Sequence, residues 1–314
     1  MSRRILSLLF LLCLPALAVC AANPSYTPLP DLGDGLYQGY QGGLYPGGRN
    51  VLPAGHLAVG KVRAGMIQPR NGTGQLDPDG RIVLLSIGMS NTTMEFSTFK
   101  QVADADPQKN PRLVVVDGAQ GSQDAEKIKE PTHSFWNVVD QRLGKAGVTG
   151  RQVQAVWLKE AIAGEKRGFP ADAQALRDDL RTIVLILHQR FPNLQVVYLA
   201  SRTYGGYAKT NLNPEPHAYE SGFAVKWLIE EQINGVEGLS ADPAKGAAKS
   251  PWLAWGPYLW TNGARGRRDG LVWEAEDVRE DGTHPSRNGC VKIARLLLDF
   301  FKTDELARRW FLRE

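Results

Sequence analysis

The sequence predicts an α/β protein in which helices cover both faces of a parallel sheet, a three-layer α/β/α sandwich. One observation is that 43% of the 314 residues are hydrophobic and 22% are charged, which is enough to bury a large core. The second is a set of short, continuous apolar runs bounded by turn residues, a pattern typical of parallel strands buried on both faces. These runs cover residues 82–87, 113–116, 153–158 and 194–199.

The third observation is that segments with helical periodicity separate or follow these runs. Between 171 and 190, apolar residues recur at helical spacing, and the pattern ends at Phe191-Pro192. A last helix is predicted from Ser286 to about Phe301. Alternating strands and helices predict a layered α/β domain, in which functional side chains gather beyond the carboxyl ends of the strands.

The N-terminus has the pattern of a signal peptide over residues 1–22. Two arginines precede an apolar run from 5 to 19, and small residues follow. The run is short for a membrane span and Pro15 interrupts it. We therefore expect a secreted or periplasmic protein without a stable membrane span after signal cleavage. A retained anchor and lipid attachment at Cys20 are the alternatives.

Residues 23–80 are rich in glycine and proline and show no helical periodicity. We predict an irregular extension with short strands, packed on a domain that covers 81–314. The net charge of +4 is small for this length and does not indicate a nucleic-acid partner. Cys290 would be the one cysteine of the mature chain, and no zinc-binding motif is present, so we predict no disulfide, metal or cofactor.

Ser90 is the first candidate for chemistry, because it directly follows the first predicted strand. The turn reads Gly88-Met-Ser-Asn91, and a helix-like segment comes next. A hydroxyl at this point lies above the sheet, near helix N–H groups that favour developing negative charge. The alternative is that Ser90 only caps the helix.

Asp281 and His284 lie three residues apart in the segment Asp-Gly-Thr-His-Pro-Ser, just before the last predicted helix. A carboxylate on one imidazole nitrogen fixes the tautomer, and the other nitrogen can then accept a proton from a serine. The alternative is a structural histidine. Together with Ser90, the pair predicts a catalytic triad with Ser90 as nucleophile, His284 as base and Asp281 as the orienting acid.

These two segments resemble the first and last motifs of the SGNH/GDSL hydrolases. Gly88-Met-Ser-Asn91 is similar to their Gly-Asp-Ser motif, and Asp281-Gly-Thr-His284-Pro-Ser, followed by Gly289, is similar to their terminal Asp-x-x-His block. The resemblance covers residues 81 to about 301. It implies a flavodoxin-like sheet of about five strands and ester hydrolysis by a serine nucleophile. Many members of the family remove acetyl groups from sugars.

The resemblance also implies an oxyanion hole. The family places a glycine after the second strand, where this chain has Asp117-Gly-Ala-Gln-Gly-Ser122. Gly121 matches that glycine best, and Gly118 is the second choice. The backbone N–H groups of Ser90 and Gly121 are therefore the predicted donors to the oxyanion. An ordinary turn at the end of the strand is the alternative.

The chain departs from the family at two positions. The family's Gly-x-Asn-Asp block, whose Asn is an oxyanion donor, is replaced after the third strand by Trp157-Leu-Lys-Glu-Ala161, and Met89 replaces the Asp that normally precedes the serine. We therefore consider Asn91 and the ammonium of Lys159 as substitute oxyanion donors. The alternative for Lys159 is that it pairs with Glu160 or faces solvent.

An aromatic run precedes the predicted catalytic turn, from Trp252 to Trp260. Aromatic faces stack on sugar rings, although core packing is their more common use. Trp255 and Trp260 are the candidate substrate-binding residues, and burial in the core is the alternative.

These features together predict a serine-dependent carboxylic-ester hydrolase that acts through an acyl-enzyme. A small molecule or a polysaccharide that carries esters is the expected substrate, and the family resemblance favours an O-acetylated carbohydrate. Two other functions stay open. The missing Asn block is compatible with a non-catalytic carbohydrate-binding module, and the same site could perform acyl transfer to another alcohol.

Overall fold

The computed structural model describes residues 26–164 and 167–313. The predicted signal peptide, residues 1–22, lies outside these ranges. In the part of the chain that is described, no helix has the length and apolar character needed to cross a membrane.

A five-stranded parallel sheet forms the centre of the molecule, in the order β4-β3-β5-β6-β7. It confirms the predicted fold class. The four predicted strands all form, with ends within two residues of those expected. The fifth strand, β7, was not predicted and uses part of the aromatic run. The strands are β3 (Ile82–Gly88), β4 (Leu113–Asp117), β5 (Val153–Lys159), β6 (Val196–Ala200) and β7 (Trp252–Trp255).

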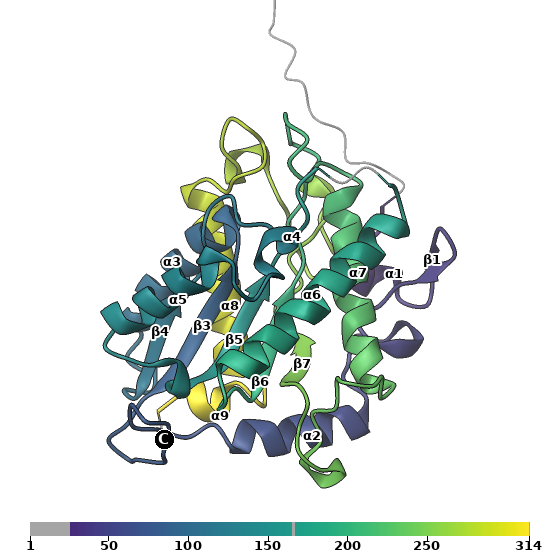
Figure 1. The fold of residues 1–314 in the computed structure, drawn as a ribbon. Coiled ribbons are helices and arrows are strands. Elements are labelled where there is room, and N and C mark those ends of the chain that lie inside the picture. The colour runs from purple at the N-terminus through teal and green to yellow at the C-terminus, as the bar shows by residue number, and fades with distance from the viewer. Residues whose placement is uncertain (1–25, 165–166, 314) are drawn as a thin grey trace, which may run out of the picture.

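Helices cover both faces of the sheet, which completes the three layers (Figure 1). Helices α3 (Ser90–Ala105) and α8 (Arg287–Thr303) pack together on one face. The opposite face is covered by α5 (Ser134–Lys145), α6 (Ala171–Arg190) and α7 (His217–Ile233). Short helices are α1 (Leu29–Leu32), α4 (Ala125–Ile128) and α9 (Arg308–Phe311), and single 3-10 turns occur at Pro46–Gly48, Gly150–Gln152, Pro243–Lys245, Gly263–Arg265 and Ala275–Asp277.

The core lies between the sheet and these helices. Every residue of β3 and β5 is buried, which explains why their sequences are continuous apolar runs rather than alternating patterns. On the face covered by α3 and α8, the rings of Phe96 and Trp157 stack with their centroids 5.6 Å apart. The rings of Phe99 and Phe301 extend this packing between the two helices.

The N-terminal segment differs from the irregular extension that the sequence predicted. A short hairpin of β1 (Leu36–Tyr37) and β2 (Tyr40–Gln41) is present, as expected, but residues Ala54–Gly65 form a regular helix, α2. The apolar periodicity of α2 is weak because its buried face includes His56, Gly60 and Arg63. A Cβ on Gly60 would lie 2.6 Å from the ring of Trp252, so only glycine lets the helix approach β7.

Candidate active site

Ser90 lies where the sequence placed it, at the turn from β3 into α3, and it is the first residue of the helix. The turn is made close to the neighbouring strand. A Cβ on Gly88 would lie 2.3 Å from the carbonyl oxygen of Lys159, so the position requires glycine. Thr92, one residue beyond Asn91, donates its hydroxyl to the same carbonyl over 2.7 Å. These contacts fasten the start of α3 to the end of β5.

The three residues of the predicted triad lie together at the carboxyl edge of the sheet. The Oγ of Ser90 is 2.8 Å from Nε2 of His284, and Nδ1 of His284 is 2.6 Å from Oδ2 of Asp281. The serine comes from the β3–α3 turn, whereas the other two residues come from the loop before α8. The imidazole therefore hydrogen-bonds to the hydroxyl on one side and to the carboxyl group on the other.

The local structure of the loop keeps Asp281 ionised. Its Oδ1 accepts hydrogen bonds from the backbone N–H groups of Thr283 and His284, each over 2.9 Å. Partial burial opposes the charge, but these two bonds and the bond from the imidazole outweigh it and lower the pKa of Asp281 to about 2. The carboxylate is thus charged at neutral pH and can stabilise a positive charge on His284.

Asn91 connects the nucleophile helix to this loop. Its Nδ2 donates to the carbonyl oxygen of Thr283 over 2.9 Å, and the residue is buried. The amide is thus already engaged with the backbone next to His284. The Asn91 side chain therefore holds the loop that contains His284, whereas we had considered it as a hydrogen-bond donor to the oxyanion.

Two backbone N–H groups are available beside the Ser90 hydroxyl. No side chain caps α3, so the N–H of Ser90 at its first position has no partner among the described residues. Gly121 lies next to Ser90, since a Cβ on it would be 3.9 Å from the Cβ of Ser90. Its N–H also makes no hydrogen bond within residues 26–164 and 167–313. The site can therefore present two donors to an oxyanion.

The structure removes Gly118 from the predicted oxyanion donors. Its N–H already donates to Ser86, over 3.1 Å to the carbonyl oxygen and 3.2 Å to the hydroxyl. A Cβ at this position would also lie 2.6 Å from the carbonyl oxygen of Ser86. Gly118 thus serves the close packing of β4 against β3.

The side chain of Lys159 does not point to the oxyanion, where we had considered it as a substitute donor. Its ammonium hydrogen-bonds to both carboxylate oxygens of Glu95 on α3, over 2.5 and 2.6 Å. The two side chains are 1% and 0% exposed. The ion pair lies in the core between β5 and α3, so the hypothesis that Lys159 serves the oxyanion was wrong. The alternative, pairing with Glu160, does not form either.

Glu160 is a feature that sequence reasoning missed. It follows β5 directly and is 1% exposed. Its Oε2 accepts the N–H of Ala161 over 3.0 Å, whereas Oε1 has no hydrogen-bond partner in the described structure. Burial raises the pKa of Glu160 well above its ordinary value. A lone glutamate in sequence is normally exposed, so nothing in the sequence pointed to this burial.

Trp255 and Trp260 lie in the core and not on a substrate surface. They are 4% and 0% exposed. Their ring N–H groups hydrogen-bond to protein, Trp255 to the carbonyl oxygen of Leu44 and Trp260 to the carboxyl group of Glu215. The prediction that these rings form a substrate wall was wrong, and the core alternative holds. Among the residues that the structure describes, no cluster of three His, Cys, Asp or Glu has the arrangement of a metal site.

Comparison with known proteins found similarity at the level of solved structures. No family model matches the sequence, and no curated protein matches it. A protein of Bacillus subtilis, YxiM, superposes with a TM-score of 0.40 at 13% identity, over 72% of this chain and 57% of its own. The periplasmic domain of a lipopolysaccharide acetyltransferase from Salmonella Paratyphi A superposes with a TM-score of 0.35 at 13% identity. That match covers 78% of this chain and 93% of the acetyltransferase domain.

The salicylyl-acyltransferase SsfX3, from a tetracycline biosynthetic pathway, superposes with a TM-score of 0.33 at 12% identity. That match covers 71% of this chain and 54% of the acyltransferase. This chain thus spans about half the length of two of these three proteins.

Proposed function

We propose that this chain is a serine-dependent carboxylic-ester hydrolase of the SGNH/GDSL type. The observation that carries the proposal is the unbroken series of hydrogen bonds from Ser90 Oγ through both nitrogens of His284 to Asp281, with distances of 2.8 and 2.6 Å. Such a series gives a serine the base it needs to become a nucleophile at neutral pH.

In the proposed acylation step, Ser90 Oγ attacks the ester carbonyl carbon while His284 Nε2 accepts the hydroxyl proton. The carbonyl electrons move to its oxygen, which the N–H groups of Ser90 and Gly121 then bind. Asp281 stabilises the imidazolium that forms, because its low pKa keeps it charged. When the oxyanion collapses, the C–O bond to the alcohol breaks, and His284 gives its proton to the leaving oxygen. The product is an acyl-enzyme.

In the second step a water molecule attacks the acyl carbonyl carbon while His284 Nε2 takes a proton from it. The bond from that carbon to Ser90 Oγ then breaks, His284 returns the proton to Ser90 Oγ, and the carboxylic acid leaves. The His284 and Asp281 side chains are 25% and 37% exposed, so water reaches this edge of the sheet. This exposure favours hydrolysis over transfer to a second alcohol, since transfer requires that water be excluded from the acyl-enzyme.

We further propose an O-acetylated carbohydrate as substrate and a secreted or periplasmic location. The first rests on the resemblance of the two motifs to acetyl-removing members of the family. The second rests on the signal-peptide pattern of residues 1–22. Since Trp255 and Trp260 are buried, the surface that recognises the sugar must be formed by other residues around Ser90.

The proposal is tested by the turnover of p-nitrophenyl acetate and of acetylated oligosaccharides, with product analysis. We expect release of acetate by the parent enzyme and by the control variant Ser134→Ala, which changes an exposed serine at the start of α5. Ser90→Ala should lower kcat by about 10⁶-fold, as in other serine enzymes.

Two outcomes would replace the proposal with one of its alternatives. A folded parent protein that binds the oligosaccharide without turnover would indicate a carbohydrate-binding module. Transfer of acetyl to an added sugar alcohol, with little free acetate, would indicate an acyltransferase.

A further inference from the structure

Asp117 accepts hydrogen bonds from three segments at the carboxyl edge of the sheet. It is the last residue of β4, and its side chain is only 12% exposed. Its Oδ1 accepts the hydroxyl of Ser86 on β3 over 2.6 Å and the backbone N–H of Ala119 over 3.1 Å. Its Oδ2 accepts the hydroxyls of Thr93 and Ser97 on α3, the latter over 2.8 Å. A carboxylate has about four lone-pair sites, so these donors occupy all of them.

These partners belong to the two parts of the chain that contain the proposed oxyanion donors. Thr93 and Ser97 lie on α3, whose first residue is Ser90. Ala119 lies just before Gly121 in the loop after β4. The segments that contain the N–H groups of Ser90 and Gly121 are therefore joined through one carboxyl group. An oxyanion hole requires both donors within about 2.7–3.1 Å of a single oxygen, so their relative position affects the rate.

The loop from Asp117 to Gly121 is also held from α5. Arg142 donates from Nη1 to the carbonyl oxygens of Asp117 and Ala119, over 2.9 and 2.6 Å, and the same nitrogen lies 3.8 Å from Oδ2 of Asp117. Ser122, the residue after Gly121, has a φ of 62°, which is uncommon for a residue with a side chain. The loop thus has a conformation that depends on its contacts with other parts of the chain.

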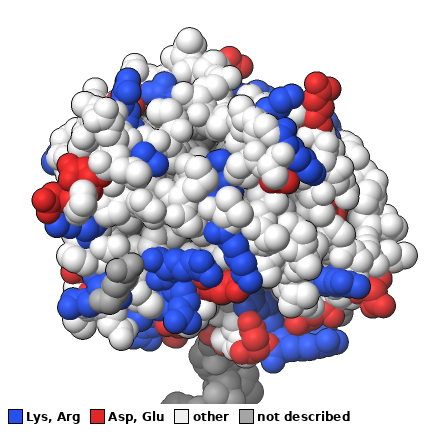
Figure 2. All heavy atoms as spheres, turned by 90° about the horizontal axis from the view of Figure 1, so that it is seen from below, with Lys and Arg blue, Asp and Glu red and all other residues white. Residues whose placement is uncertain are grey.

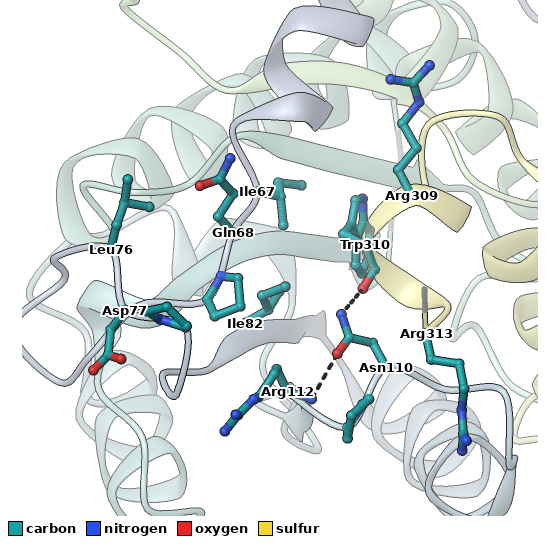
Figure 3. A pocket seen from close by; sticks show the side chains of 13 residues that line it. Ile67, Gln68, Leu76, Asp77, Ile82, Asn110, Arg112, Arg309, Trp310 and Arg313 are labelled. Carbon is teal, nitrogen blue, oxygen red and sulfur yellow. Dashed lines mark hydrogen bonds between the residues drawn. The ribbon is translucent and has the colours of Figure 1, made fainter.

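The amino edge of the sheet lacks such a convergence of polar groups. A hollow of about 600 Å³ lies there between the segment before β3, the turn before β4 and α9 (Figure 3). The side chains of Arg309 and Arg313 point in opposite directions, and Arg309 Nε donates to the carbonyl oxygen of Glu305 over 3.1 Å. On this lower face, Lys and Arg are interspersed with Asp and Glu (Figure 2). Changes at this edge can therefore serve as controls for changes around Asp117.

We propose that Asp117 is a positioning residue for the oxyanion hole, which holds α3 and the loop after β4 together and so keeps the N–H groups of Ser90 and Gly121 directed at one point. The inference rests on the proposed ester hydrolysis, because it assigns Asp117 a part in that reaction. Asp117 is not a catalytic residue itself, since both of its oxygens accept hydrogen bonds from the protein. If its role were only structural, changing it would lower Tm without changing the stabilisation of the transition state.

The first test is Thr93→Val, which removes a bond between Asp117 and α3 with little change in shape. We expect kcat for p-nitrophenyl acetate to fall about tenfold, while KM stays within about twofold, because the lost contact acts on the transition state. The matched control is Thr98→Val on the same helix. The Thr98 hydroxyl donates to the carbonyl oxygen of Met94, so this variant should keep the parent kcat.

Replacing Asp117 itself should have a larger effect. Asp117→Ala removes all of these bonds, and we expect kcat to fall by about 10²–10³-fold, as it does when an oxyanion donor is lost. Asp117→Asn keeps one acceptor oxygen and should have a kcat between those of Asp117→Ala and the parent. Equal kcat in the parent and in folded Asp117→Ala would overturn the inference.

Binding of 2,2,2-trifluoroacetophenone separates the stabilisation of the transition state from the stability of the fold. Ser90 Oγ adds to the carbonyl carbon of this ketone, the carbonyl electrons move to its oxygen, and His284 accepts the hydroxyl proton. The adduct thus presents an oxyanion to the two N–H groups. We expect affinity for the ketone to fall in Thr93→Val and Asp117→Ala by the same factor as kcat/KM. Arg309→Gln/Arg313→Gln should change neither quantity. Variants that only lose Tm would contradict a positioning role.

A crystal structure of Asp117→Ala gives a result that does not depend on turnover, and Thr93→Val takes its place if the Asp117 variants do not fold. We expect Gly121 to lie farther from Ser90 than in the parent protein. If Gly121 keeps its place, the inference fails even when the parent enzyme releases acetate. If the parent releases no acetate but the loop moves in the variant, the hydrolase proposal fails while the positioning of Gly121 by Asp117 stands.

Discussion

The two edges of the sheet differ in how their polar groups are paired. At the carboxyl edge, Ser90, His284 and Asp281 are linked to one another by hydrogen bonds, and the loop backbone holds the last of them. At the amino edge, the exposed side chains make looser contacts: Arg309 Nε donates to the carbonyl oxygen of Glu305 over 3.1 Å, and Arg313 acts on Asp106 only through its charge, behind the hydrogen bond from Lys302. The fixed series lets the imidazole take a proton from the hydroxyl while the carboxylate stays charged, whereas the arginines of the amino edge belong to no such series. The two edges of the same sheet thus differ in how firmly their polar groups are held, and the carboxyl edge contains the three groups of the proposed triad.

Among the variants that test this difference, Asp281→Asn should have the largest effect on kcat. The amide keeps the shape but presents a different hydrogen-bond partner to His284 Nδ1, so the imidazole is held in the wrong tautomer. We expect kcat to fall by about 10²–10⁴-fold, as in other triads. The fall is measured on p-nitrophenyl acetate. A loss of less than tenfold would mean that Asp281 does not orient the base.

The same variant should change the acid stability of the protein. The pKa of Asp281 is lowered from 3.8 to about 2 in the folded protein, so its ionised form stabilises the fold above about pH 4. That stability is lost as the pH falls toward 2 and the folded carboxylate becomes protonated. Thermal unfolding of the parent should therefore show a steeper loss of Tm over this range than that of Asp281→Asn. Parallel curves would contradict the low pKa.

A smaller effect is expected from Asn91→Ala. The variant removes the bond to the Thr283 carbonyl and leaves that buried oxygen without its donor, which costs enough to lower kcat about tenfold. KM should change little, because Asn91 positions His284 and its amide is not placed to contact substrate. Asn288→Ala, an exposed change on α8, is the control. If kcat is unchanged and only Tm falls, Asn91 stabilises the fold but does not position His284 for catalysis.

The smallest effect on activity is expected from Gly121→Ala, compared with Gly118→Ala. A methyl group on Gly121 would lie 3.9 Å from the Cβ of Ser90, an ordinary contact distance, and the backbone N–H would stay in place. We therefore expect kcat and Tm to be nearly unchanged. On Gly118 the methyl group would lie 2.6 Å from a backbone oxygen and should destabilise the fold by about 1–3 kcal/mol. Unfolding curves and kcat for both variants check this difference. Equal destabilisation would mean that Gly121 is also a packing residue.

Four of the five strands, and the three side chains that meet at the carboxyl edge, left local signals in the sequence. Buried parallel strands have nearly continuous apolar runs, Ser90 follows the first predicted strand, and Asp281 and His284 lie in the turn before the last predicted helix. Helix α2 was missed because its contact with β7 is made by Gly60, which adds nothing to an apolar pattern.

The other errors concern which way a side chain points, and this depends on partners far away in the sequence. Lys159 was expected at the oxyanion, but Glu95, 64 residues earlier, holds it in the core. Trp255 and Trp260 were considered for sugar stacking, but Leu44 and Glu215 satisfy their ring N–H groups inside the protein. Local sequence contains no information about these partners, so only the fold could decide between core and surface.

The most direct test of the account is labelling with a fluorophosphonate probe, followed by peptide mapping. Such probes react with a serine that a neighbouring base activates, and they do not require knowledge of the substrate. We predict a single adduct at Ser90, a much slower reaction in Asp281→Asn, and an unchanged rate in Arg309→Gln/Arg313→Gln. No adduct at Ser90 in the folded parent protein, or one that forms equally fast in Asp281→Asn, would contradict the claim that the three residues form a working triad.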